Sequence, residues 1–104
     1  MIEKTFPFAK GNEKVIERVI VDEHINYNHM ILPKGNRLPH HSSNANVYMS
    51  VIRGTVSLGL DDQEAHLYPC GTIIYIPEGV RMDVINGGED TLELFVVKAP
   101  APKA

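Results

Sequence analysis

The stretch from Gly71 to Asn86 constrains the fold of this 104-residue chain more than any other feature. After Gly71 comes an apolar run rich in β-branched residues, and then a sharp turn at Pro77-Glu78-Gly79. A second run of mostly apolar residues continues from the turn to Asn86. The pattern predicts two short strands joined by a tight turn, with glycine and proline marking the strand boundaries.

Similar short β-rich runs recur along the chain, with turn residues between them. They predict strands at residues 14–21, 25–32, 46–52, 55–60, 72–76, 80–86 and 91–98. The run at 14–21 also fits one face of a helix, but its density of β-branched residues favours a strand. Many short strands with turns between them indicate an all-β barrel or sandwich, in which one face of each strand converges on a single interior.

Size and composition narrow the function classes. A chain of this length is most simply one domain, and 43% hydrophobic with 22% charged residues is ordinary for a globular protein. A net charge of −3 supplies no basic face for a phosphate backbone, so we expect no nucleic-acid partner. No apolar run approaches the ~20 residues of a membrane span, and no stretch has signal-peptide character. With a single cysteine, Cys70, the chain is expected to be cytoplasmic.

The Gly71–Asn86 stretch resembles the second conserved motif of the cupin family, Gly-x5-Pro-x-Gly-x2-His-x3-Asn. Every position matches except one, where Met82 stands in place of the histidine. The resemblance implies a small antiparallel jelly-roll β-barrel. It also implies a single cupin domain over residues 1–104, with a core at about 14–98 between a short extended N-terminal arm and a C-terminal tail.

The first cupin motif, Gly-x5-His-x-His-x3–4-Glu-x6-Gly, is similar to the stretch from Gly35 to Gly54. Both glycines and the first histidine, His41, fall in register. Ser43 replaces the second histidine and Val47 replaces the glutamate. The resemblance therefore extends over both motifs, which cover half of the chain.

In metal-binding cupins, the two motifs supply three histidines and one glutamate to a divalent ion. Here the resemblance places those roles at His41, Ser43, Val47 and Met82. A serine hydroxyl is a poor ligand, valine cannot coordinate, and methionine sulfur favours Cu(I) over hard divalent ions. We therefore expect no tightly held metal and no cofactor, since His41 is the only retained ligand position. The alternative is a divalent transition metal, weakly held.

The resemblance and the strand alternation also indicate which side chains face the interior. His40 is expected to face outward, because neighbours on a strand point to opposite faces. The interior residues either line a largely apolar ligand pocket, with one imidazole and one hydroxyl, or simply fill the barrel. The candidate pocket residues are His41, Ser43, Val47, Met49, Met82 and Val84.

The leading functional hypothesis is a small cupin that binds a small organic ligand without a tightly held metal, and no residue is assigned a catalytic role. The alternative is a metal-dependent cupin enzyme of the dioxygenase or isomerase type that uses His41. A third hypothesis is a structural or sensory module that acts through its dimer surface. The resemblance implies a homodimer formed through sheet edges and N-terminal strands, for which Phe6, Phe8 and residues 15–21 supply apolar surface.

Overall fold

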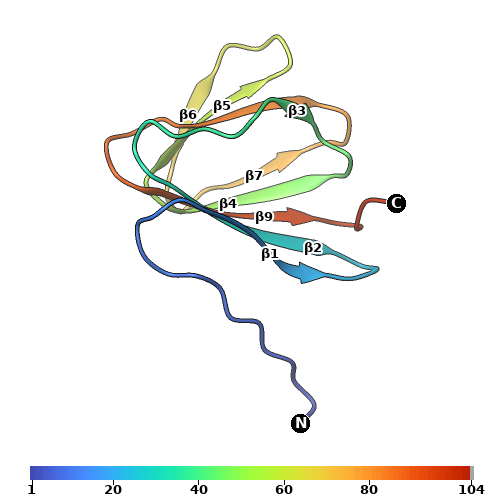
Figure 1. The fold of residues 1–104 in the computed structure, drawn as a ribbon. Helices are drawn as coiled ribbons and strands as arrows, with labels where there is room; N and C mark the ends of the chain where they lie inside the picture. The colour runs from blue at the N-terminus through green and yellow to red at the C-terminus, as the bar shows by residue number, and fades with distance from the viewer. Residues whose placement is uncertain (104) are drawn as a thin grey trace.

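The computed structural model describes residues 1–103 and is all-β, with no helix among them. Its nine strands form two antiparallel sheets, one in the order β1-β2-β9-β4-β7 and the other in the order β3-β8-β5-β6 (Figure 1). The strands are β1 (Val15–Val21), β2 (Asn26–Leu32), β3 (His41–Ser42), β4 (Val47–Arg53), β5 (Thr55–Leu60), β6 (His66–Pro69), β7 (Ile73–Ile76), β8 (Arg81–Asn86) and β9 (Leu92–Lys98).

All seven strands predicted from the sequence are present, each with ends within one residue of the prediction. The ambiguous run at 14–21 is strand β1, which pairs with β2. The sequence patterns missed β3 and β6. β3 has two residues, and β6 has four and ends in a proline, so neither is long enough to show an alternating pattern.

The two sheets enclose one apolar core to which alternate residues of each strand contribute. In β9, Leu92, Leu94 and Val96 are buried in this core, whereas Glu93 and Phe95 lie on the outer face of the sheet. The core is formed by Leu32, Leu38, Val47, Met49, Val51, Val56, Leu58, Ile76, Met82, Val84, Leu92, Leu94 and Val96.

The Pro77–Gly79 turn leads from β7 in one sheet to β8 in the other. Gly79 has a φ of 90°, a conformation that favours glycine because it has no Cβ. The Gly79 amide donates to the Ser43 carbonyl oxygen at 2.8 Å, and the Glu78 amide donates to Oδ1 of Asn46 at 3.0 Å. The turn of the second motif is thus bonded to the segment that follows β3 in the first motif.

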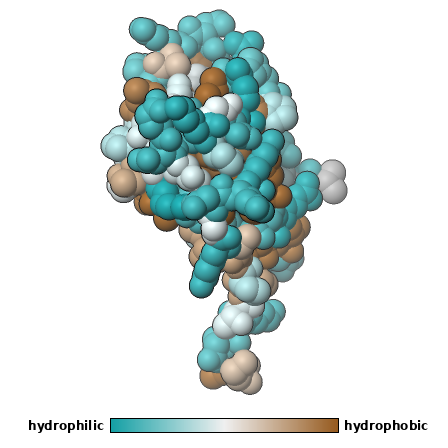
Figure 2. Space-filling view, turned by 60° about the vertical axis from the view of Figure 1, so that its left-hand side comes forward, coloured by the Kyte–Doolittle hydropathy of each residue, from teal (hydrophilic) through white to brown (hydrophobic). Residues whose placement is uncertain are grey.

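Residues 1–8 form an extended arm whose tip extends away from the two sheets (Figure 1). At the base of the arm, Phe8 packs against His29 and Phe95 of the five-stranded sheet. The same protrusion is seen in the space-filling view, below a surface where apolar and polar side chains are mixed (Figure 2). Met1 and Ile2, at its tip, are fully exposed. Within residues 1–103, no helix offers the length and apolar character that crossing a membrane requires.

Candidate functional site

The structure brings the two cupin motifs together as their alignment requires. His41 of β3 lies directly opposite Met82 of β8 in the antiparallel ladder. Opposite residues in such a pair share a face of the sheet, so both belong to the inner face of the barrel. Ser43 and Val47 follow along the same segment and are buried, at 3% and 0% exposed.

The four side chains do not form a ligand set for a divalent metal. The Ser43 hydroxyl donates to the Ala45 carbonyl oxygen, while Val47 and Met82 pack into the core. The expectation that His41 lines an enclosed interior is corrected, because this side chain is exposed and its Nδ1 lies 3.0 Å from the Pro39 carbonyl oxygen. β3 is a two-residue strand at the edge of its sheet, and both of its residues are exposed. Within residues 1–103, no cluster of three or more histidine, cysteine or acidic side chains is arranged to hold a metal.

Four of the predicted pocket residues fill the barrel interior. Val47, Met49, Met82 and Val84 are at most 3% exposed and belong to the single apolar core. At these four positions the side chains pack against one another in the core. A ligand-binding role for them stays a prediction.

Polar side chains gather where β1, β2 and β9 lie side by side in the five-stranded sheet. We call Arg18, Asn26, Asn28, Asn44 and Lys98 the barrel-mouth cluster. In the ladders, Arg18 lies opposite Asn28, and Asn26 lies opposite Lys98. Asn28 and Lys98 continue the core-facing sides of their strands, so they point toward the interior. The Lys98 ammonium donates to Oδ1 of Asn44 at 2.8 Å.

Two features set the electrostatics of this cluster. Burial lowers the pKa of the Lys98 ammonium, and the nearby Arg18 guanidinium lowers it further. The side-chain oxygen Oδ1 of Asn28 is buried and has no hydrogen-bond partner within residues 1–103. Leaving a buried acceptor unsatisfied costs about 1–3 kcal/mol, so the cluster has unused bonding capacity.

A hollow of about 370 Å³ adjoins the barrel-mouth cluster. Its walls are Asn44, Ala45, Asn46, Glu78 and the tail residues 100–103. The tail is held in place by the Ala99 amide, which donates to the Asn46 carbonyl oxygen, and by the Ala101 amide, which donates to the His24 carbonyl oxygen. Asn44 belongs to both the cluster and the hollow, and so connects them.

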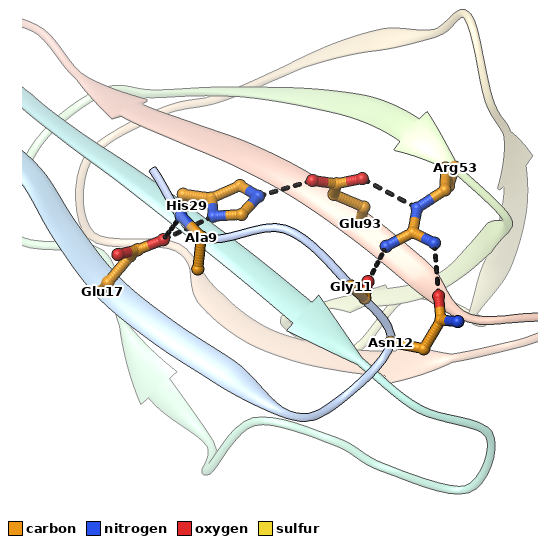
Figure 3. A network of polar contacts seen from close by, with 7 residues as sticks. All are labelled: Ala9, Gly11, Asn12, Glu17, His29, Arg53 and Glu93. Carbon is orange, nitrogen blue, oxygen red and sulfur yellow. Dashed lines mark hydrogen bonds and ion pairs between the residues drawn. The ribbon is translucent and has the colours of Figure 1, made fainter. Parts of the chain in front are cut away.

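A second polar arrangement lies on the outer face of the five-stranded sheet (Figure 3). His29 of β2 is completely buried between two carboxylates. Its Nδ1 lies 2.7 Å from Oε2 of Glu17, and its Nε2 lies 2.6 Å from Oε2 of Glu93. Arg53 donates from Nε to the other oxygen of Glu93 at 2.7 Å. These four residues form what we call the His29 network.

The His29 network holds the base of the N-terminal arm against the sheet (Figure 3). The Ala9 amide donates to Glu17 at 2.9 Å. Arg53 donates to the Gly11 carbonyl oxygen at 2.6 Å and to Oδ1 of Asn12 at 2.7 Å. The polar attachment of residues 9–12 therefore depends on the same side chains that surround His29.

Aromatic rings complete the cover over His29. The ring of Phe8 lies 4.9 Å from the imidazole, centre to centre, and 5.1 Å from the ring of Phe95. The centre of the Phe95 ring also lies 5.0 Å from the centre of the imidazole. These contacts exclude water from the imidazole, which strengthens its interactions with the two carboxylates.

Both carboxylates of the network have a lowered pKa. For Glu17 the main cause is the hydrogen bond from the Ala9 amide, followed by that from His29. For Glu93, burial raises the pKa, but hydrogen bonds from His29 and Arg53 together outweigh it. A carboxyl group whose pKa is lower in the folded state stabilises the fold above its unfolded pKa. That stabilisation is lost as the pH falls through the folded pKa, so we expect the network to weaken in acid.

Sequence reasoning did not find the His29 network. Alternation along residues 25–32 does place His29 on the side opposite Met30, but the partners come from β1, β4 and β9, whose register is not visible in the sequence. The other four histidines, His24, His40, His41 and His66, are exposed. His40 faces outward, 3.2 Å from Oδ1 of Asp83.

The strand order and the two joined motifs define a jelly-roll cupin barrel. The chain is 45% identical over 104 residues to the uncharacterized protein MJ0764 of Methanocaldococcus jannaschii, with 99% of this chain and 90% of that protein covered. The crystal structure described as an RmlC-like cupin family protein (MJ0764), with a double-stranded β-helix fold, matches with a TM-score of 0.93 and 44% identity, over 96% of this chain and 93% of that one. The chain therefore belongs to the RmlC-like cupin family.

More distant structures share the fold alone. The cupin domain of Schizosaccharomyces pombe Cnp3 matches with a TM-score of 0.77 at 14% identity, over 95% of this chain and 69% of that one. A cupin domain from Bordetella pertussis Tohama I matches with a TM-score of 0.72 at 18% identity, over 93% of this chain and 100% of that one. No family model matches the sequence.

Proposed function

We propose that this protein binds a small organic molecule at the open end of its barrel without a tightly held metal. The observation that carries the proposal is the barrel-mouth cluster. In it, Asn28 has a buried acceptor without a partner within residues 1–103, and Asn44, which accepts from Lys98, also lines a hollow of about 370 Å³. Small-molecule sites are concave and place a few polar groups among apolar walls. The hollow offers both, with Asn44 and Asn46 beside Pro100 and Ala101.

The side chains at the four motif positions argue against the alternative, a metal-dependent cupin enzyme that uses His41, because most of them are poor metal ligands. Such an enzyme needs several nitrogen and oxygen donors directed at one point, with a position left open for substrate. Here a single exposed imidazole faces a valine, a methionine and a serine whose hydroxyl is bonded to the backbone. These residues do not fit a divalent ion, so we assign no chemical step to them.

Native mass spectrometry of protein purified without an affinity tag tests this proposal. We expect a mass above that of the chain that corresponds to a small organic molecule, and we expect denaturation to release that molecule. About one iron, manganese, nickel or zinc atom per chain, lost in the His41→Ala variant, would overturn the proposal and support the metal-dependent enzyme.

We also propose that two copies of the chain form a homodimer. β1 is an edge strand of the five-stranded sheet, and an uncovered edge with apolar side chains is a liability in water. Its Ile16 and Val21 are 53% and 58% exposed, and Phe6 and Phe8 of the arm are 44% and 43% exposed. The tip of the arm, with Met1 and Ile2 fully exposed, extends away from the sheets and is free to pack on a second copy.

Light scattering coupled to size-exclusion chromatography at micromolar concentration is expected to give twice the chain mass of 11.6 kDa. Deleting residues 1–8 should shift the mass toward the monomer, because the deletion removes the exposed apolar arm. The exposed variant Lys103→Gln serves as a control and should stay dimeric. A monomer mass for the intact chain across a tenfold dilution series would count against this proposal.

A further inference from the structure

We propose that the barrel-mouth cluster binds a small hydroxy acid, an organic carboxylate that carries a hydroxyl group a few atoms from its charge. This inference rests on the proposed function and deepens it by naming the ligand class. Two cations would take the carboxylate, and the buried oxygen of Asn28 would accept a hydrogen bond from the hydroxyl.

The charge of the cluster favours an anion. Arg18 lies opposite Asn28 in the β1–β2 ladder, and Lys98 lies diagonally from Asn28 in the β2–β9 ladder, so two cations flank this side chain. Within residues 1–103, neither of these two cations forms an ion pair with a carboxylate. By contrast, Lys34, Arg37, Arg53 and Arg81 each pair with an acidic side chain. A bound carboxylate would relieve the repulsion between the two cations. The fork of N–H donors on arginine matches the two oxygens of a carboxylate.

Because Oδ1 of Asn28 is an acceptor, the ligand must carry a hydrogen-bond donor in addition to its negative charge. A carboxylate has only acceptors, so it cannot satisfy Oδ1 of Asn28, whereas a hydroxyl group can. Asn28 lies opposite Arg18 across the β1–β2 ladder and diagonally from Lys98 across the β2–β9 ladder. Diagonal neighbours in a sheet are about 7–8 Å apart, so a molecule of a few carbon atoms reaches all three groups.

The surroundings set the size and the character of the remaining part of the ligand. The Lys98 ammonium is directed to Asn44, which also lines the hollow. Pro100 and Ala101 supply apolar contacts in that hollow for a carbon skeleton. A neutral ligand would leave the two cations unpaired, and a polyanion such as nucleic acid is disfavoured by the net charge of −3.

Titration of the full-length, untagged protein at low ionic strength tests the inference. The probes are lactate, propionate, which lacks only the hydroxyl of lactate, and inorganic phosphate, each titrated by calorimetry or NMR. We expect lactate to bind at least about fivefold more tightly than propionate or phosphate, because a buried polar group left unpaired weakens binding.

Substitutions locate the binding. Arg18→Gln and Lys98→Gln should each weaken lactate binding about tenfold or more, since each removes a cation from a hydrogen-bonded pair. Asn28→Leu should remove the preference for lactate over propionate. The control Lys34→Gln removes an exposed cation in the loop before β3 and should leave the affinity unchanged.

Several outcomes would overturn the inference. They are equal affinity of the wild type for lactate and propionate, tighter binding of phosphate, no binding of any probe, and unchanged lactate affinity in folded Arg18 and Lys98 variants. The wild-type comparison of lactate with propionate needs no variant, so it decides the question even if a variant fails to fold. A neutral organic molecule found by native mass spectrometry would overturn the hydroxy-acid inference alone, whereas a stoichiometric metal would overturn the proposed function.

Discussion

Replacing His29 by alanine is expected to lower the free energy of unfolding by about 3–5 kcal/mol, the usual cost of truncating a large buried aromatic side chain to alanine. The substitution leaves Glu17 and Glu93 without their shared donor, and it removes a ring that packs against both Phe8 and Phe95. Urea denaturation followed by circular dichroism measures the effect. The matched control is His24→Ala, an exposed histidine, whose effect should stay within about 0.5 kcal/mol.

The pH dependence of the same variant separates loss of charge interactions from loss of packing. In the wild type, stability should fall as the pH drops below the ordinary glutamate range, because the pKa of Glu17 and that of Glu93 are lowered in the folded state. In His29→Ala this acid-dependent loss should be smaller, since a cause of each lowered pKa is gone. Parallel pH profiles for the wild type and the variant would contradict the role assigned to the network.

Rebuilding the cupin ligand set is expected to have an effect of similar size. The triple variant Ser43→His, Val47→Glu, Met82→His places two imidazoles and a carboxylate at buried positions. Without metal it should be less stable than the wild type, by on the order of 1–3 kcal/mol for each unpaired polar group. Added nickel, manganese or zinc should restore stability, because a ligand that binds only the folded state stabilises it.

The controls for this experiment isolate the geometry of the motif. The wild type should show little thermal response to the same metals, and the variant without the Met82→His change should respond less than the triple variant. Because His41 is exposed and lies opposite Met82, it can complete the site from the solvent side. A folded triple variant that binds no metal by calorimetry would show that these four positions do not converge.

The fold could be predicted well from the sequence because turns and strands are each encoded by a few consecutive residues. The Pro77–Gly79 turn and the runs of β-branched residues reflect the conformations of a few consecutive residues, and these conformations survive in the folded chain. The two short strands β3 and β6 were missed because two and four residues are too few to show an alternating pattern.

The sites were less predictable because they depend on register and enclosure. Alternation placed Val47, Met49, Met82 and Val84 correctly on the inner face, and the sequence could not decide whether they line a space or fill it. His41 shares that face but lies at an open edge. The other members of the His29 network come from β1, β4 and β9, whose relative register no local pattern encodes.

The central claim is that a small ligand binds at the barrel mouth and not among the core residues of the cupin motifs. A two-dimensional NMR comparison of ligand-loaded and ligand-free protein tests it most directly, with side-chain amides and methionine methyl groups observed in the same sample. We predict that the amide signals of Asn28 and Asn44 shift while the methyl signals of Met49 and Met82 remain in place. Large shifts of these two methyl signals, with unchanged amide signals of the two asparagines, would contradict the account.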